Sequence, residues 1–91
     1  MIISFQHKGL ENFYRTGSVK GIQARHAKKL SEILLMFDSV ANLREIHKSY
    51  RLHRLKGQYA LYHAIWVDKN WRVIFQFELG NFELIDYLDY H

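Results

Sequence analysis

Residues 71–78 have the sequence WRVIFQFE, in which large apolar side chains recur at every second position. The apolar positions are Trp71, Val73, Phe75 and Phe77. The positions between them carry Arg72, Gln76 and Glu78, and Ile74 is the exception to the alternation. A period of two is typical of a β-strand that buries one face, so these residues are predicted to form a strand with Trp71 packed in the core.

Further strands are predicted on both sides of this one. Residues 61–67 (LYHAIWV) precede it across the short turn at 68–70, and residues 82–90 follow it after the turn at 80–81. Further upstream, residues 50–55 (YRLHRL) also read as a strand. Short turns favour antiparallel neighbours, so residues 50–90 are predicted to form a meander of four strands.

Two helices are predicted ahead of these strands. Between residues 22 and 37 the apolar side chains step by three and four and form one stripe: Ile22, His26, Ala27, Leu30, Ile33, Leu34 and Phe37. A shorter helix around residues 10–16 ends at Gly17, and residues 2–6 read as a first strand. The order β-α-α-β-β-β-β predicts an α+β fold, with two helices packed on one face of a mainly antiparallel sheet. The chain has no proline and no linker, which predicts one domain over residues 1–91.

The composition excludes several classes of protein. With 48% hydrophobic and 15% aromatic residues, the chain is not expected to be disordered. It has no cysteine, which excludes disulfides, thiol nucleophiles and thiolate metal sites. Its apolar runs, such as residues 33–37, are far shorter than the roughly 20 residues of a membrane span. Residues 1–5 lack the basic region of a signal peptide, so we expect a cytoplasmic protein that does not bind membranes.

Positive charge is concentrated in the first half of the chain. Residues 1–56 contain 11 Lys and Arg but only 4 Asp and Glu, whereas residues 57–91 contain 2 and 5. An uneven distribution of this kind favours a polyanionic partner such as nucleic acid. A basic half on its own is also compatible with a domain that binds nothing acidic.

The C-terminal residues suggest acid–base chemistry. The chain closes on Asp89, Tyr90 and His91, and strand alternation places Asp89 and His91 on one face with Tyr90 on the other. His53 lies in a basic run on the predicted strand 50–55. RNA cleavage by the ribose 2′-hydroxyl needs a base, an acid and cations around the phosphate, and histidine with Lys or Arg can supply all three without a metal. A terminal histidine can also be an ordinary surface residue.

Other uses of these residues have less support. The six histidines show no i, i+4 pair and no H-E-x-x-H spacing, so no metal site is predicted. No glycine-rich nucleotide-binding loop and no G-x-S-x-G motif occurs, so no cofactor is predicted. Aromatic residues near the basic run could stack on unpaired bases, although most are expected to belong to the core: Tyr50, Tyr59, Tyr62, Trp66, Trp71 and Tyr90.

Five segments of the chain, in order, resemble HigB-type toxins of the RelE superfamily. They are residues 5–14 (FQHKGLENFY), residues 17–30 with Gly17-Ser18, Gly21-Ile22-Gln23 and His26-Ala27-Lys28-Lys29-Leu30, residues 50–57 (YRLHRLKG), residues 70–75 (NWRVIF) and residues 86–91 (DYLDYH). The resemblance implies a small RelE-like α+β domain and a toxin of a type II toxin–antitoxin module. Such toxins are endoribonucleases that enter the A site of the 70S ribosome and cut mRNA, which inhibits translation. The implied partner is a HigA-like helix-turn-helix antitoxin, and operator DNA is contacted only through the antitoxin complex.

The resemblance also implies the site. His53 and the closing Asp89, Tyr90 and His91 would be the catalytic residues, with His53 or Asp89 as base, His91 as acid and Tyr90 as an orienting or stacking residue. Four cations would bind the phosphates or the RNA: Lys56, Arg72, Arg51 and Arg54. No metal and no cofactor is implied.

The chain departs from the family pattern at three positions. Arg54 stands where many members have proline, His63 where many have tryptophan, and Gln76 where many have arginine. These departures leave an alternative open, namely a catalytically weak or inactive homologue that binds the antitoxin as a corepressor. A basic RNA-binding protein of another kind is the third possibility.

Overall fold

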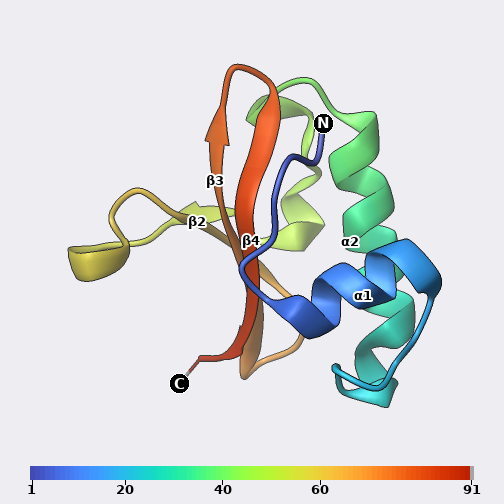
Figure 1. The fold of residues 1–91 in the computed structure, drawn as a ribbon. Helices are drawn as coiled ribbons and strands as arrows, with labels where there is room; N and C mark the ends of the chain where they lie inside the picture. Colours follow the sequence, from blue (N-terminus) through green and yellow to red (C-terminus); the bar gives the residue numbers. More distant parts are fainter. Residues whose placement is uncertain (91) are drawn as a thin grey trace.

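The computed structural model describes residues 1–90 and confirms the α+β class. Helices α1 (Lys8–Thr16) and α2 (Ala27–Ser39) lie on one face of a four-stranded sheet (Figure 1). The strands are β1 (His53–Arg54), β2 (His63–Trp66), β3 (Trp71–Glu78) and β4 (Asn81–Asp89). They are ordered β1-β2-β3-β4, and each pairs antiparallel with the next. Of the helices formed by residues 1–90, none has both the length and the apolar content of a membrane-spanning segment.

The main core lies between α2 and the middle of the sheet. Val73 and Phe75 of β3 are fully buried, as the alternation of residues 71–78 predicts. The ring of Phe37 from α2 stacks on Phe82 of β4 at 4.2 Å between centroids and meets Phe75 edge-on at 4.9 Å. The predicted stripe on α2 is confirmed, because its apolar members from Leu30 to Phe37 are the residues that α2 buries.

A β-bulge in β4 decides which of its side chains face the helices. Gln76 pairs with Glu83 and Ile74 pairs with Asp86, so β4 has one more residue than β3 between these pairs. Leu84 occupies the left-handed region, with φ 52°, at this point. The extra residue brings Phe82, Ile85 and Tyr87 to the core, and all three are buried there.

Three predicted elements have different extents in the structure. Residues 2–6 make only two isolated parallel bridges to β4, Ile2–Phe82 and Phe5–Ile85, because the bulge between these partners interrupts a continuous ladder. The strand predicted at 50–55 is reduced to the two residues of β1. Lys48–Tyr50 is a 3-10 helix and Arg51 has φ 54°, which turns the chain before the ladder begins.

The helix predicted from residue 22 instead opens with a 3-10 turn at Ala24–His26, and its α-helical part runs to Ser39. Two glycines set the path of the chain into this turn. A Cβ atom on Gly9 would lie 2.3 Å from the carbonyl oxygen of Gly21, and a Cβ on Gly21 would lie 2.5 Å from the Cα of Gly9. The start of α1 and the loop before α2 therefore cross in direct backbone contact, which only glycine allows.

Candidate active site

The face of the sheet that points away from α1 and α2, called here the open face, carries the candidate site. Register places His53, Ala64, Ile74 and Asp86 in one row across the four strands. Ala64 and Ile74 belong to a second small apolar cluster with Leu55, separate from the main core. Ile74, the exception to the predicted alternation, is 1% exposed within this cluster.

Arg72 is the central cation of the open face. It is only 8% exposed. Its Nη1 donates to the carbonyl oxygens of Asp68 at 2.7 Å and Trp71 at 3.1 Å, and its Nε has no hydrogen-bond partner within residues 1–90. The pairs of basic and acidic side chains in contact within residues 1–90 are Arg15–Glu11 and His26–Asp68, and the second is an ion pair only when His26 is protonated. A buried guanidinium outside these pairs is well suited to binding an anion.

Aromatic rings hold Arg72 in place. Its Cζ lies 4.2 Å from the ring centroid of Trp66, its register partner on β2, and 5.8 Å from that of Tyr90. The Cζ of Arg51 lies 4.1 Å from the same Trp66 centroid. The structure thus brings together two of the predicted phosphate-binding residues, Arg51 and Arg72, on one tryptophan.

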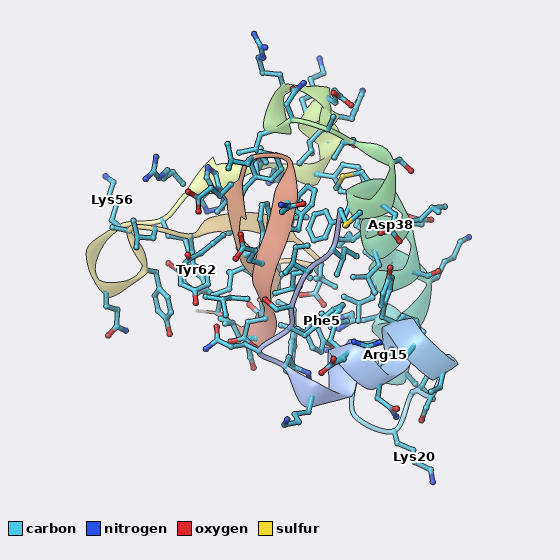
Figure 2. The ribbon with its side chains drawn as sticks, turned by 45° about the horizontal axis from the view of Figure 1, so that its top comes forward. Phe5, Arg15, Lys20, Asp38, Lys56 and Tyr62 are labelled. Atoms are coloured by element: carbon cyan, nitrogen blue, oxygen red, sulfur yellow. The ribbon has the colours of Figure 1, made fainter. Side chains whose placement is uncertain are left out.

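The other two predicted phosphate-binding residues lie on the β1–β2 loop (residues 55–62) or at its start. Arg54 is exposed, and its Nε donates to the Ala60 carbonyl at 3.2 Å, which ties the loop to β1. Figure 2 shows Lys56 extending outward from this projecting loop, on the side of the molecule opposite the helices that carry Arg15 and Asp38. The structure therefore does not bring Arg54 and Lys56 to the place where Arg51 and Arg72 contact Trp66.

His53 is exposed on the open face and has a defined tautomer. Its Nδ1 lies 2.9 Å from the carbonyl oxygen of Arg51. A carbonyl oxygen only accepts, so Nδ1 carries the hydrogen and donates it. The neutral imidazole then presents an unprotonated Nε2, which is the form that can take a proton from a substrate.

The closing residues continue β4 at the edge of this cluster. Asp89 is the register partner of Trp71, and the Tyr90 amide donates to the Asn70 carbonyl at 2.6 Å. Alternation along β4 places Asp89 on the helix side and Tyr90 on the open face, where its half-exposed ring is near Arg72. The remaining predicted catalytic residue, His91, lies outside the described residues.

A network of hydrogen-bonded side chains that the sequence analysis did not predict lies next to the site. The hydroxyl of Tyr87 lies 2.6 Å from Nδ1 of His26, and Nε2 of His26 lies 2.7 Å from the carboxylate of Asp68. Burial raises the pKa of Tyr87, so its hydroxyl keeps its proton and donates to His26. Asp68 accepts from the amides of Asn70 and Trp71 and offers its carbonyl to Arg72. This hydrogen-bond network fixes the turn at 68–70, whose Asp68 carbonyl accepts a hydrogen bond from Arg72.

The Asp68 carboxylate links stability to pH. Burial raises its pKa, but the hydrogen bonds from His26, Trp71 and Asn70 outweigh this and lower it from 3.8 to about 2. Because the pKa of this carboxyl is lower in the folded state than in the unfolded state, the carboxylate stabilises the fold at pH values above the unfolded-state pKa. This contribution is lost as the pH falls toward 2. We predict that Asp68→Asn lowers the free energy of unfolding at pH 5 and that its difference from wild type shrinks between pH 4 and pH 2. Urea unfolding across this range measures it, and a pH-independent difference would contradict it.

All three departures from the family pattern line one separate hollow. His63 and Gln76 line a space of about 370 Å³ with Arg54 and Phe77. The His63 ring stacks on Phe75 at 5.8 Å, and burial together with the Arg54 charge lowers its pKa. The cation–ring contacts on the open face are made by Arg51 and Arg72 with Trp66 and Tyr90, and none of the three departures takes part in them.

Comparison with known proteins finds relatives of the whole chain. A family model described as the RelE-like toxin of type II toxin–antitoxin system HigB matches residues 3–91. The chain is 37% identical over 92 residues to the endoribonuclease HigB of Proteus vulgaris, and the match covers all of both proteins.

Solved toxin structures share the fold at low sequence identity. The YoeB/ParE toxin from Agrobacterium tumefaciens superimposes with a TM-score of 0.62 at 18% identity, over all of both chains. YafQ from E. coli strain BL21(DE3) superimposes with a TM-score of 0.58 at 14% identity, over 98% of this chain and 91% of that one. These likenesses establish the fold, and the predicted RelE-like architecture is confirmed.

Proposed function

The chain belongs to the HigB family of RelE-like toxins of type II toxin–antitoxin systems, and from this membership we propose that it is an endoribonuclease that cleaves mRNA on the ribosome. The observation that carries the proposal is the 37% sequence identity, over the full length of both chains, to a protein named as an endoribonuclease. The open face supports it, because it carries the exposed imidazole of His53 and the buried guanidinium of Arg72. Arg72 belongs to neither of the two pairs given above.

The proposed reaction is attack of a ribose 2′-oxygen on the adjacent phosphorus. Nε2 of His53 takes the 2′-hydroxyl proton, the bond from the 2′-oxygen to phosphorus forms, and the bond from phosphorus to the 5′-oxygen breaks. The leaving 5′-oxygen takes a proton from a second group, and the resemblance assigns that role to His91. Arg72, with Arg51 beside it, stabilises the extra negative charge on the phosphate oxygens. Tyr90 orients the substrate from the neighbouring position.

The proposed partners follow from the same family membership. A type II toxin is neutralised by an antitoxin, and we propose a HigA-like helix-turn-helix protein for this chain. The ribosomal A site and its mRNA are the proposed targets, and operator DNA is contacted only through the antitoxin complex. All of these partners place the protein in the cytoplasm.

Induced expression in bacteria tests the proposal. We expect growth arrest, new mRNA 5′ ends within translated regions, and loss of both when the chain lacks His91. Ends that persist when translation is blocked would contradict the dependence on the ribosome. Purified protein that binds ribosomes and leaves mRNA uncut would instead favour the inactive homologue.

A further inference from the structure

Trp66 stands between two cations on the open face. Its register partner on β3 is Arg72. Arg51 precedes the two-residue strand β1, and its guanidinium also lies over the Trp66 ring. The guanidinium carbons lie 4.1 Å and 4.2 Å from the same ring centroid. Arg51 is exposed, whereas Arg72 is buried. The indole therefore connects an outer cation to an inner one.

This arrangement keeps two like charges close together. Both guanidinium groups are within contact of one indole, so they are separated by no more than twice the longer of the two distances. The ion pairs given within residues 1–90 involve neither of them. The electron-rich faces of tryptophan attract cations, and this attraction opposes the repulsion between the two arginines. Without the indole, the exposed Arg51 side chain would be free to move away from Arg72.

We propose that Trp66 is a positioning residue for RNA binding: it holds Arg51 and Arg72 against one ring so that the pair contacts the RNA backbone as one unit. The proposal rests on the proposed function for the identity of its ligand, single-stranded RNA. It goes beyond that function because Trp66 carries no charge and no group that takes part in proton transfer.

Salt dependence of RNA binding separates this role from simple packing. Each phosphate contact by a cation releases counterions, and its loss lowers the slope of log affinity against log salt by about one. We expect Trp66→Leu to weaken binding roughly three- to tenfold and to lower this slope by about one, although it removes no charge. Arg51→Gln is expected to lower the slope by the same amount. The double variant is expected to lose less than the sum of the two.

The measurement uses fluorescence anisotropy with a short single-stranded RNA whose riboses are 2′-O-methylated. Such an RNA cannot be cut through its 2′-oxygen, so binding is read independently of cleavage. Tyr50→Leu is the matched control, because it removes an aromatic–cation contact that involves neither Arg51 nor Arg72, Lys29 over Tyr50 at 4.8 Å, and is expected to leave the slope unchanged. Trp66→Phe should restore most of the lost slope. If Trp66→Leu fails to fold by circular dichroism, Trp66→Met takes its place.

The outcomes separate this inference from the proposed function. A folded Trp66→Leu protein with wild-type affinity and slope overturns the positioning role, even if the wild-type protein cuts mRNA. A lowered slope together with a wild-type protein that cuts no mRNA supports the positioning role and contradicts the proposed enzyme activity.

Discussion

His53→Ala is expected to lower the rate of mRNA cleavage on the ribosome by roughly 10²- to 10⁴-fold, which is the usual contribution of a general base. The imidazole is exposed and makes one hydrogen bond, to the Arg51 carbonyl. Its removal should therefore leave the free energy of unfolding within about 0.5 kcal/mol of wild type. Single-turnover cleavage on programmed ribosomes measures the first quantity, and urea unfolding measures the second.

A second histidine provides the control for this experiment. His47 is also exposed, and its Nδ1 interacts only with Ser49 two residues away. His47→Ala is expected to cleave at the wild-type rate. A folded His53→Ala protein that cleaves as fast as the His47→Ala protein would remove His53 from the active site.

Arg72→Met is expected to reduce cleavage by roughly 10²- to 10³-fold with little change in stability. The loss of activity follows from removing the cation that faces the developing charge on the phosphate. Stability should change little, because the loss of two hydrogen bonds to the Asp68 and Trp71 carbonyls is offset by removing a buried charge that takes part in neither of the pairs given within residues 1–90. Cleavage and unfolding assays on the same preparation test both expectations.

The matched variant is Arg44→Met, since Arg44 is an exposed arginine in the same basic half of the chain. It should cleave and unfold like wild type. If Arg72→Met lost activity only in proportion to a loss of folded protein, Arg72 would be a structural residue and its assignment to the phosphate would be wrong.

The parts of the fold that were predictable from sequence are those with long periodic patterns. The strand at 71–78 and the stripe on α2 each place large apolar side chains on the helix–sheet core at regular spacing over several turns or repeats, so their pattern is clear. β1 has only two residues, too few for a pattern. Arg51 and Leu84 adopt left-handed conformations that favour glycine, so their residue types give no signal of the turn or the bulge.

Some contacts of the candidate site were likewise predictable from the sequence, and others were not. The turn at 68–70 implies that Trp66 faces Arg72, so this pair was derivable from the predicted hairpin. The His26–Asp68–Tyr87 network was not, because His26 is 42 residues from Asp68 and 61 from Tyr87, and only the packing of α2 on the sheet brings them together. The assignment of His53, Asp89, Tyr90 and His91 comes from the family resemblance and stays a prediction.

The shortness of β1 has a consequence for how this enzyme fails. β1 is an outer strand held to β2 through two residue pairs, and it carries His53, whereas Arg72 is a buried residue of the eight-residue strand β3 in the interior of the sheet. Segments with so few contacts detach at a fraction of the free energy of complete unfolding. Detachment of β1 would separate the imidazole from the guanidinium while the rings of Phe37, Phe75 and Phe82 stay packed. Mild heating would then abolish RNA cleavage at temperatures well below the midpoint of global unfolding. The temperature range of activity would be set by the attachment of β1 to the sheet.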